Sequence, residues 1–169
     1  MLEIDTYLKL NKFLFYDYSF LVSYNIDSLS NINHVLDLWK YDRQTLQSTM
    51  QIRIYDSVGC LVNGYTQCYG DMNKINIFSK KETKHFEQFC NNYALKFENE
   101  LQLLPITKEI KEDIMLKSSQ KKYTIVVYWN IWSNYFSKVM FYKIDKYLKK
   151  YQMKENTLII LINTDNIMS

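Results

Sequence analysis

Glycine, proline, alanine and arginine are scarce in this chain of 169 residues, and two of these scarcities exclude classes of site. With only three glycines, the sequence holds no glycine-rich loop of the kind that cradles phosphate groups. Arginine occurs only at Arg43 and Arg53, whereas proteins that read nucleic-acid bases depend on arginine for bidentate contacts. The lysines are spread along the chain, and the net charge is only +3. We therefore expect no nucleic-acid partner.

Cysteine and histidine are also rare, which limits metal and redox chemistry. The three cysteines, Cys60, Cys68 and Cys90, lack the paired spacing of a zinc site, so we expect no metal and no cofactor. Cys60 and Cys68 lie in or beside a predicted hairpin and could form a disulfide in an oxidising compartment. Packing as small apolar side chains is the favoured alternative. The two histidines, His34 and His85, belong to no recognisable catalytic triad.

Long apolar runs are missing as well. None approaches the roughly 18–20 residues that a membrane-spanning helix needs, so we expect no transmembrane segment in this chain. The start, MLEIDTYLKL, lacks the basic and apolar regions of a signal peptide. The 47% of hydrophobic residues suffice to bury the core of a domain of ordinary size. We attribute the 15 tyrosines to the codon bias of an AT-rich genome, which also favours lysine, asparagine and isoleucine.

The first 104 residues contain a predicted hairpin and a predicted long helix. Residues 51–69 place β-branched and aromatic residues on both sides of the turn signal Asp-Ser-Val-Gly, which predicts a β-hairpin. Apolar residues at three- and four-residue spacing predict an amphipathic helix over residues 82–104, which Pro105 ends. A short strand is expected within residues 20–26.

The last third of the chain reads as a strand–helix–strand unit. Residues 123–129 (YTIVVYW) and 157–162 (TLIILI) are nearly continuous apolar and aromatic runs, typical of strands buried on both faces of a sheet. Between them, apolar side chains of residues 136–151 recur on one helical face, and Ser133 is placed to cap this helix. Two parallel strands joined by a helix form a βαβ unit.

The segment YWNIWSNYFSKVM, residues 128–140, resembles the active-site segment of thioredoxin-like proteins, especially exported thiol–disulfide oxidoreductases of the TlpA type. Their pattern is a hydrophobic strand, Phe-Trp-Ala-x-Trp, Cys-x-x-Cys, and a helix with Lys and Met. Residues 128–132 match the aromatic lead-in, and Lys138 and Met140 match the helix. Residues 161–165 (LINTD) resemble the end of the second strand.

The positions that carry the chemistry of that family are changed here. Its two cysteine positions fall on Ser133 and Phe136, and neither side chain can act as the attacking thiolate or the resolving thiol of disulfide exchange. Its cis-proline has no counterpart, because Pro105 lies elsewhere. Asp27 and Asp165 each end a predicted strand and are loop caps rather than an acid–base pair. We therefore expect no redox catalysis at this junction.

A weaker resemblance concerns residues 52–65 (IRIYDSVGCLVNGY), which are similar to a late hairpin of TlpA-type domains. Residues 1–104 would then supply the helix–strand–strand–helix half of a thioredoxin fold, and residues 105–169 the strand–helix–strand half. The halves would stand in permuted order, or the chain would be a piece of a larger tandem. We expect one compact α/β unit with a small central sheet flanked by helices.

The resemblance implies a non-catalytic thioredoxin-like module that binds a peptide or protein partner in a bacterial cell envelope. Trp132, Asn134 and Tyr135 would contact that partner. The alternative is a thiol–disulfide oxidoreductase, or a degenerate fragment of one, that uses Cys60 and Cys68. A third interpretation is a cytoplasmic structural protein with incidental similarity, if no leader precedes this chain.

Overall fold

The computed structural model describes residues 2–11, 16–21, 50–66 and 96–165. No helix in these ranges is both long and apolar enough to cross a bilayer. The elements, in chain order, are α1 (Leu2–Leu10), β1 (Tyr18–Leu21), β2 (Gln51–Asp56), β3 (Leu61–Thr66), α5 (Phe97–Leu103), α6 (Lys108–Ser119), β4 (Tyr123–Trp129), α7 (Asn134–Lys150), the 3-10 helix η2 (Lys154–Asn156) and β5 (Thr157–Asn163).

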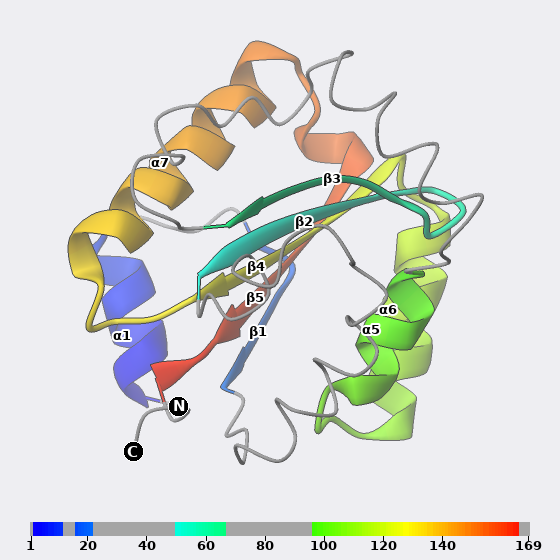
Figure 1. The fold of residues 1–169 in the computed structure, drawn as a ribbon, viewed down its shortest axis with the longest axis horizontal. Helices are drawn as coiled ribbons and strands as arrows, with labels where there is room; N and C mark the ends of the chain where they lie inside the picture. Colours follow the sequence, from blue (N-terminus) through cyan, green and yellow to red (C-terminus); the bar gives the residue numbers. More distant parts are fainter. Residues whose placement is uncertain (1, 12–15, 22–49, 67–95, 166–169) are drawn as a thin grey trace.

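The described strands form one mixed five-stranded sheet in the order β1-β5-β4-β2-β3 (Figure 1). The strands β1, β5 and β4 run parallel. The β2–β3 hairpin is antiparallel, and β2 pairs antiparallel with β4. Because β2 lies beside β4 and β1 lies beside β5, the first 104 residues and the last 65 share a single sheet. The chain is thus an α/β protein, as the sequence predicts.

Helices cover both faces of this sheet, with α1 and α7 on one face and α5 and α6 on the other (Figure 1). Successive side chains of a strand point to opposite faces, and β4 follows this rule. Ile125, Val127 and Trp129 join the core beside α1 and α7, whereas Val126 and Tyr128 join the core beside α5 and α6. Both faces of β4 and β5 are therefore apolar, which is why these runs show no polar alternation.

The helix α7 follows the predicted apolar stripe at Met140, Ile144 and Leu148 but not at its ends, where Phe136 and Tyr151 are exposed. Its buried residues recur at three- and four-residue spacing and are Ser137, Met140, Phe141, Ile144 and Leu148. At its end, Gln152 takes a positive φ of 53°. The N–H of Met153 then donates to the carbonyl of Leu148 at 2.9 Å, which is the Schellman pattern that closes a helix.

The long helix predicted over residues 82–104 is wrong at its centre. Lys96 has extended backbone angles (φ −93°, ψ 144°) and forms a β-bridge with Cys60. The N–H of Phe97 donates to the carbonyl of Gly59 at 2.8 Å, so α5 begins only at Phe97, anchored to the hairpin turn. Residues 82–95 lie outside the described residues. The helix ends at Leu103, just before Pro105, where the residue preceding a proline is extended.

The first strand also differs from the expectation. It covers Tyr18–Leu21 rather than residues 20–26, and residues 22–26 lie outside the described part. Asp17 explains the earlier start. Its backbone N–H donates to the carbonyl of Ile159 at 3.0 Å, and its carboxylate accepts the N–H of Ile159 at 2.8 Å.

Candidate functional site at the β4–α7 junction

The junction between β4 and α7, residues 130–133, lies at the carboxyl end of two neighbouring parallel strands. Trp129, the last residue of β4, pairs with Asn163, the last residue of β5. In parallel α/β sheets this edge commonly holds the functional site. The sequence places its candidate residues here as well, namely Trp132, Ser133, Asn134, Tyr135 and Phe136.

The carboxylate of Asp165 holds the first half of the junction loop. The N–H of Ile131 donates to both carboxylate oxygens, at 2.8 Å and 3.0 Å, and the N–H of Trp132 lies 3.5 Å from Oδ1. Asn163 fixes the carboxylate in turn, because its Nδ2 donates to Oδ2 at 2.7 Å. Asp165 thus acts as the loop cap that the sequence indicates. An external anion would have to compete with this internal carboxylate for the same N–H groups.

Asn130 holds the second half of the loop. It is fully buried, its Oδ1 accepts the N–H of Ser133 at 2.8 Å, and its carbonyl accepts the hydroxyl of Ser137 at 2.7 Å. The prediction that the Ser133 side chain caps α7 is wrong: Ser133 occupies the N-cap position, but its side chain makes no capping hydrogen bond. An asparagine side chain that bonds a nearby backbone N–H competes well for this role. Asn130 was missed although its type and place carry that signal.

Trp129, the residue before the junction, packs in the core between Tyr7 and Phe141. It is fully buried, with its ring 5.5 Å from that of Tyr7 and 5.4 Å from that of Phe141. Its indole N–H is buried and has no hydrogen-bond partner among the described residues. Trp129 is therefore a core residue, as expected for a strand buried on both faces, while Trp132 next to the turn lies outside this core.

Tyr7 of α1 is a member of the junction that no sequence pattern indicated. Its hydroxyl donates to Oδ1 of Asn134 at 2.6 Å, across 127 positions of sequence. Burial, and then the negative charge of Asp165, raise the pKa of this hydroxyl above its ordinary value of 10.0. The amide oxygen of Asn134 therefore already accepts an intramolecular hydrogen bond, which reduces the hydrogen bonding that this residue can offer a partner.

Three aromatic side chains beside the junction face solvent. Trp132 is 56% exposed, Tyr135 72% and Phe136 43%. The rings of Tyr135 and Phe136 are 5.4 Å apart and meet edge to face at 76°. We call Trp132, Tyr135 and Phe136 the junction platform.

The structure does not place a catalytic base for Ser133, because His34 and His85 both lie outside the described ranges. Within those ranges, no three His, Cys, Asp or Glu side chains are grouped to hold a metal ion. The junction platform is an apolar surface: Trp132 lies on the loop that Asp165 and Asn130 fix, and Tyr135 and Phe136 lie in the first turn of α7.

Cys60 lies at the opposite end of the sheet. Asp56, at the start of its turn, pairs with Tyr123 at the beginning of β4, so the hairpin turn and the junction are separated by about 20 Å of strand. Cys60 is disulfide-bonded, so the favoured expectation that it packs as a small apolar side chain is wrong. Cys68 and Cys90 lie outside the described residues. The pairing of Cys60 with Cys68 stays a prediction.

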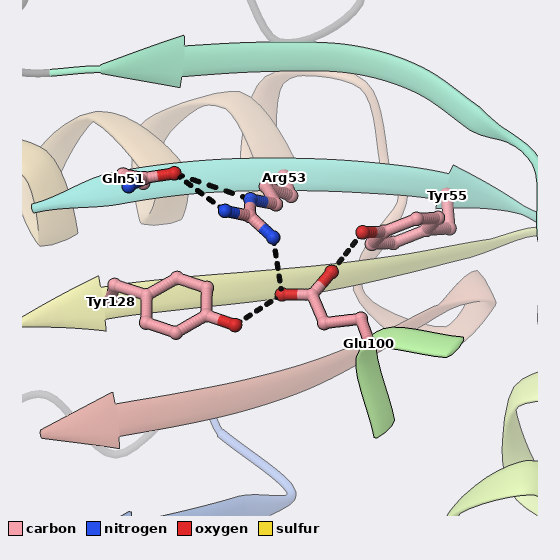
Figure 2. A network of polar contacts seen from close by, with 5 residues as sticks. All are labelled: Gln51, Arg53, Tyr55, Glu100 and Tyr128. Atoms are coloured by element: carbon pink, nitrogen blue, oxygen red, sulfur yellow. Dashed lines mark hydrogen bonds and ion pairs between the residues drawn. The ribbon is translucent and has the colours of Figure 1, made fainter. Parts of the chain in front are cut away.

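A second polar cluster lies under α5 and was not predicted (Figure 2). Glu100 of α5 is buried against β2 and β4, where its Oε1 lies 3.1 Å from Nη1 of Arg53. The hydroxyls of Tyr128 and Tyr55 donate to the two oxygens of the same carboxylate. Gln51 accepts from the other side of the guanidinium, with its Oε1 2.9 Å from Nη2 of Arg53.

This cluster is closed to solvent, since all five of its side chains are buried. Every oxygen of Glu100 has a donor, which is the condition under which a buried charge is tolerated. The guanidinium of Arg53 also lies 5.1 Å from the centroid of the Tyr128 ring. We infer that this cluster anchors α5 to the sheet. A rare arginine between two isoleucines of a predicted strand was the signal that could have revealed it.

No protein-family model matches this chain, and no curated protein or solved structure matches it significantly. The resemblance to thioredoxin-like proteins stays a prediction.

Proposed function

We propose that this chain is a non-catalytic, thioredoxin-like module that binds a peptide or protein partner at the β4–α7 junction. The observation that carries the proposal is the exposure of Trp132, Tyr135 and Phe136 next to a loop held by internal hydrogen bonds. Exposed aromatic side chains supply much of the energy at binding hot spots. A loop that is already ordered loses little conformational entropy when a partner binds.

The arrangement of the sheet supports the thioredoxin-like part of the proposal. The unit β4-α7-β5 has two parallel strands joined by a helix, and the β2–β3 hairpin lies antiparallel beside β4. This arrangement is compatible with the two halves that the resemblance implies. The hairpin comes first in the chain, which fits a permuted order or a piece of a larger tandem.

The non-catalytic part rests on the residues at the two thiol positions. Ser133 and Phe136 occupy these positions, and Cys60 lies at the far end of the sheet. The chain should therefore fail to reduce insulin disulfides with dithiothreitol above background. Turnover that disappears in Cys60→Ser or Cys68→Ser would overturn this part and support the oxidoreductase alternative. The disulfide at Cys60 fits the proposed cell-envelope location, because disulfides persist in oxidising compartments.

The binding part can be tested by selection from a display library of random linear peptides. The wild-type chain is the bait, and the double variant Trp132→Ala, Tyr135→Ala serves for counter-selection in the same buffer. We expect enriched peptides that bind the wild type and not the variant. Enrichment that is equal on the two baits, or absent on both, would contradict a binding role of the junction platform.

A further inference from the structure

The solvent-facing side of α7 carries a stripe of two tyrosine rings and three lysine ammonium groups. Its members recur at three- and four-residue spacing, so they lie along one face of the helix. All are exposed, and they are Tyr135, Lys138, Tyr142, Lys146 and Lys149. Tyr135 also belongs to the junction platform. The stripe therefore extends the apolar platform into a positively charged surface.

The positive charge of the protein is concentrated on α7. This helix has five lysines and one aspartate, a net charge of +4, whereas the whole chain has +3. The rest of the chain therefore carries a net charge of −1. The helix α6 on the opposite face gives the comparison, since its three lysines are balanced by three acidic residues. Two of those lysines form ion pairs, Lys108 with Glu112 and Lys117 with Asp113.

The carboxylate of α7 itself does not balance its lysines. Asp145, the one acidic residue of this helix, pairs with Lys149 at 2.5 Å. Lys146 instead lies with its Nζ 6.0 Å from the centroid of the Tyr142 ring. Burial, and then the positive charge of Lys146, lower the pKa of Lys143. The one carboxylate of α7 thus leaves this helix with a net charge of +4, which an acidic partner would balance.

We infer that the partner of the junction platform is an acidic peptide segment, anchored by an apolar side chain on the platform and bearing Asp or Glu residues that follow the stripe along α7. This inference rests on the proposed function and names the chemistry of its partner. Complementary charge raises association rates and selects among partners. A nucleic acid fits less well, because the chain has only two arginines and one of them, Arg53, is buried against Glu100.

The peptides selected on the wild-type chain provide the first test. We expect them to combine a net negative charge with at least one aromatic or large aliphatic residue. A selected peptide, synthesised with a fluorophore, is then titrated by anisotropy at low ionic strength. The variant Lys138→Gln, Lys146→Gln should bind it about fivefold more weakly, since exposed pairs each contribute modestly. The difference should shrink in about 0.5 M salt.

The matched control is the variant Lys108→Gln, Lys154→Gln, which removes two positive charges outside the stripe. Both lysines are exposed, on α6 and on η2, and this variant should bind the peptide within about twofold of the wild type. Neutral or basic selected peptides, or equal weakening in both lysine variants, would overturn the inference while the proposed function stands. Tighter binding of anionic lipid vesicles or of oligo-dT than of the acidic peptide, again lost with the stripe lysines, would also overturn it.

Discussion

The carboxylate of Asp165 accepts the backbone N–H of Ile131 at 2.8 Å, which ties the residues after β5 to the loop after β4. Asn130 then fixes the start of α7 through the N–H of Ser133. The protein thus supplies its own anion to the N–H groups of this loop. The two side chains give the junction a defined shape, beside which the rings of Trp132, Tyr135 and Phe136 are exposed.

Removing the internal carboxylate should loosen the junction. Asp165→Ala leaves the N–H of Ile131 without its acceptor, and we expect a loss of about 1–3 kcal/mol in the free energy of unfolding. Urea denaturation measures it. The control is Asp145→Ala, which removes a surface ion pair with Lys149 and should cost less than about 1 kcal/mol. Equal small losses in the two variants would show that Asp165 does not hold the loop.

The buried pair of Arg53 and Glu100 should behave as a coupled unit. Arg53→Met or Glu100→Leu alone leaves one buried charge without its partner, and each should cost about 3–5 kcal/mol. The double variant should be less destabilised than the sum of the single losses, because it removes both charges. A double-mutant cycle from urea denaturation gives the coupling. Additive losses would mean that the pair does not interact in solution.

Tyr7 should make the free energy of unfolding depend on pH in the alkaline range. Its pKa is raised in the folded protein, so the neutral hydroxyl is the form that folding favours. Its contribution is fully present below the ordinary pKa of 10.0 and is lost as the pH rises through the raised pKa. Between about pH 9 and 12, the wild type should lose stability more steeply than Tyr7→Phe. Parallel curves for the two proteins would assign the loss to other tyrosines.

The disulfide can be checked by counting thiols in protein from an oxidising expression host. Under denaturing, non-reducing conditions we expect one free thiol, Cys90, with Cys60 and Cys68 paired. Peptide mapping separates this result from a pairing of Cys60 with Cys90. Three free thiols would contradict the disulfide altogether.

The sequence predicts the centre of the fold and fails at its periphery for a physical reason. The strands predicted at residues 123–129 and 157–162 are β4 and β5, because apolar runs buried on both faces are hard to mistake. The predicted helix over 82–104 fails at Lys96. Apolar spacing continues through this position, but its backbone angles are set by a bridge to Cys60, which no local pattern encodes.

The residues of the candidate site were also predicted only in part. Trp132 and Tyr135 were selected because they flank a turn, and both are exposed. Asp165 was expected to cap a loop, and it does so. Tyr7 lies in a helix at the other end of the chain and reaches Asn134 only because α1 and α7 share a face of the sheet. Such a contact depends on the complete fold and cannot be read from local sequence.

The most direct test of the junction platform measures Trp132→Ala twice, once for peptide binding and once for thermal unfolding. The control is Leu116→Ala on α6, which removes an exposed side chain of similar exposure, 60% against 56%. We predict that Trp132→Ala weakens the binding of a selected peptide by about tenfold or more. The melting temperature of this variant should stay within about 4 °C of the wild type. Leu116→Ala should leave both unchanged. Unaltered peptide binding, or a loss of about 3–5 kcal/mol in stability as for a core tryptophan, would contradict a partner-binding role for Trp132.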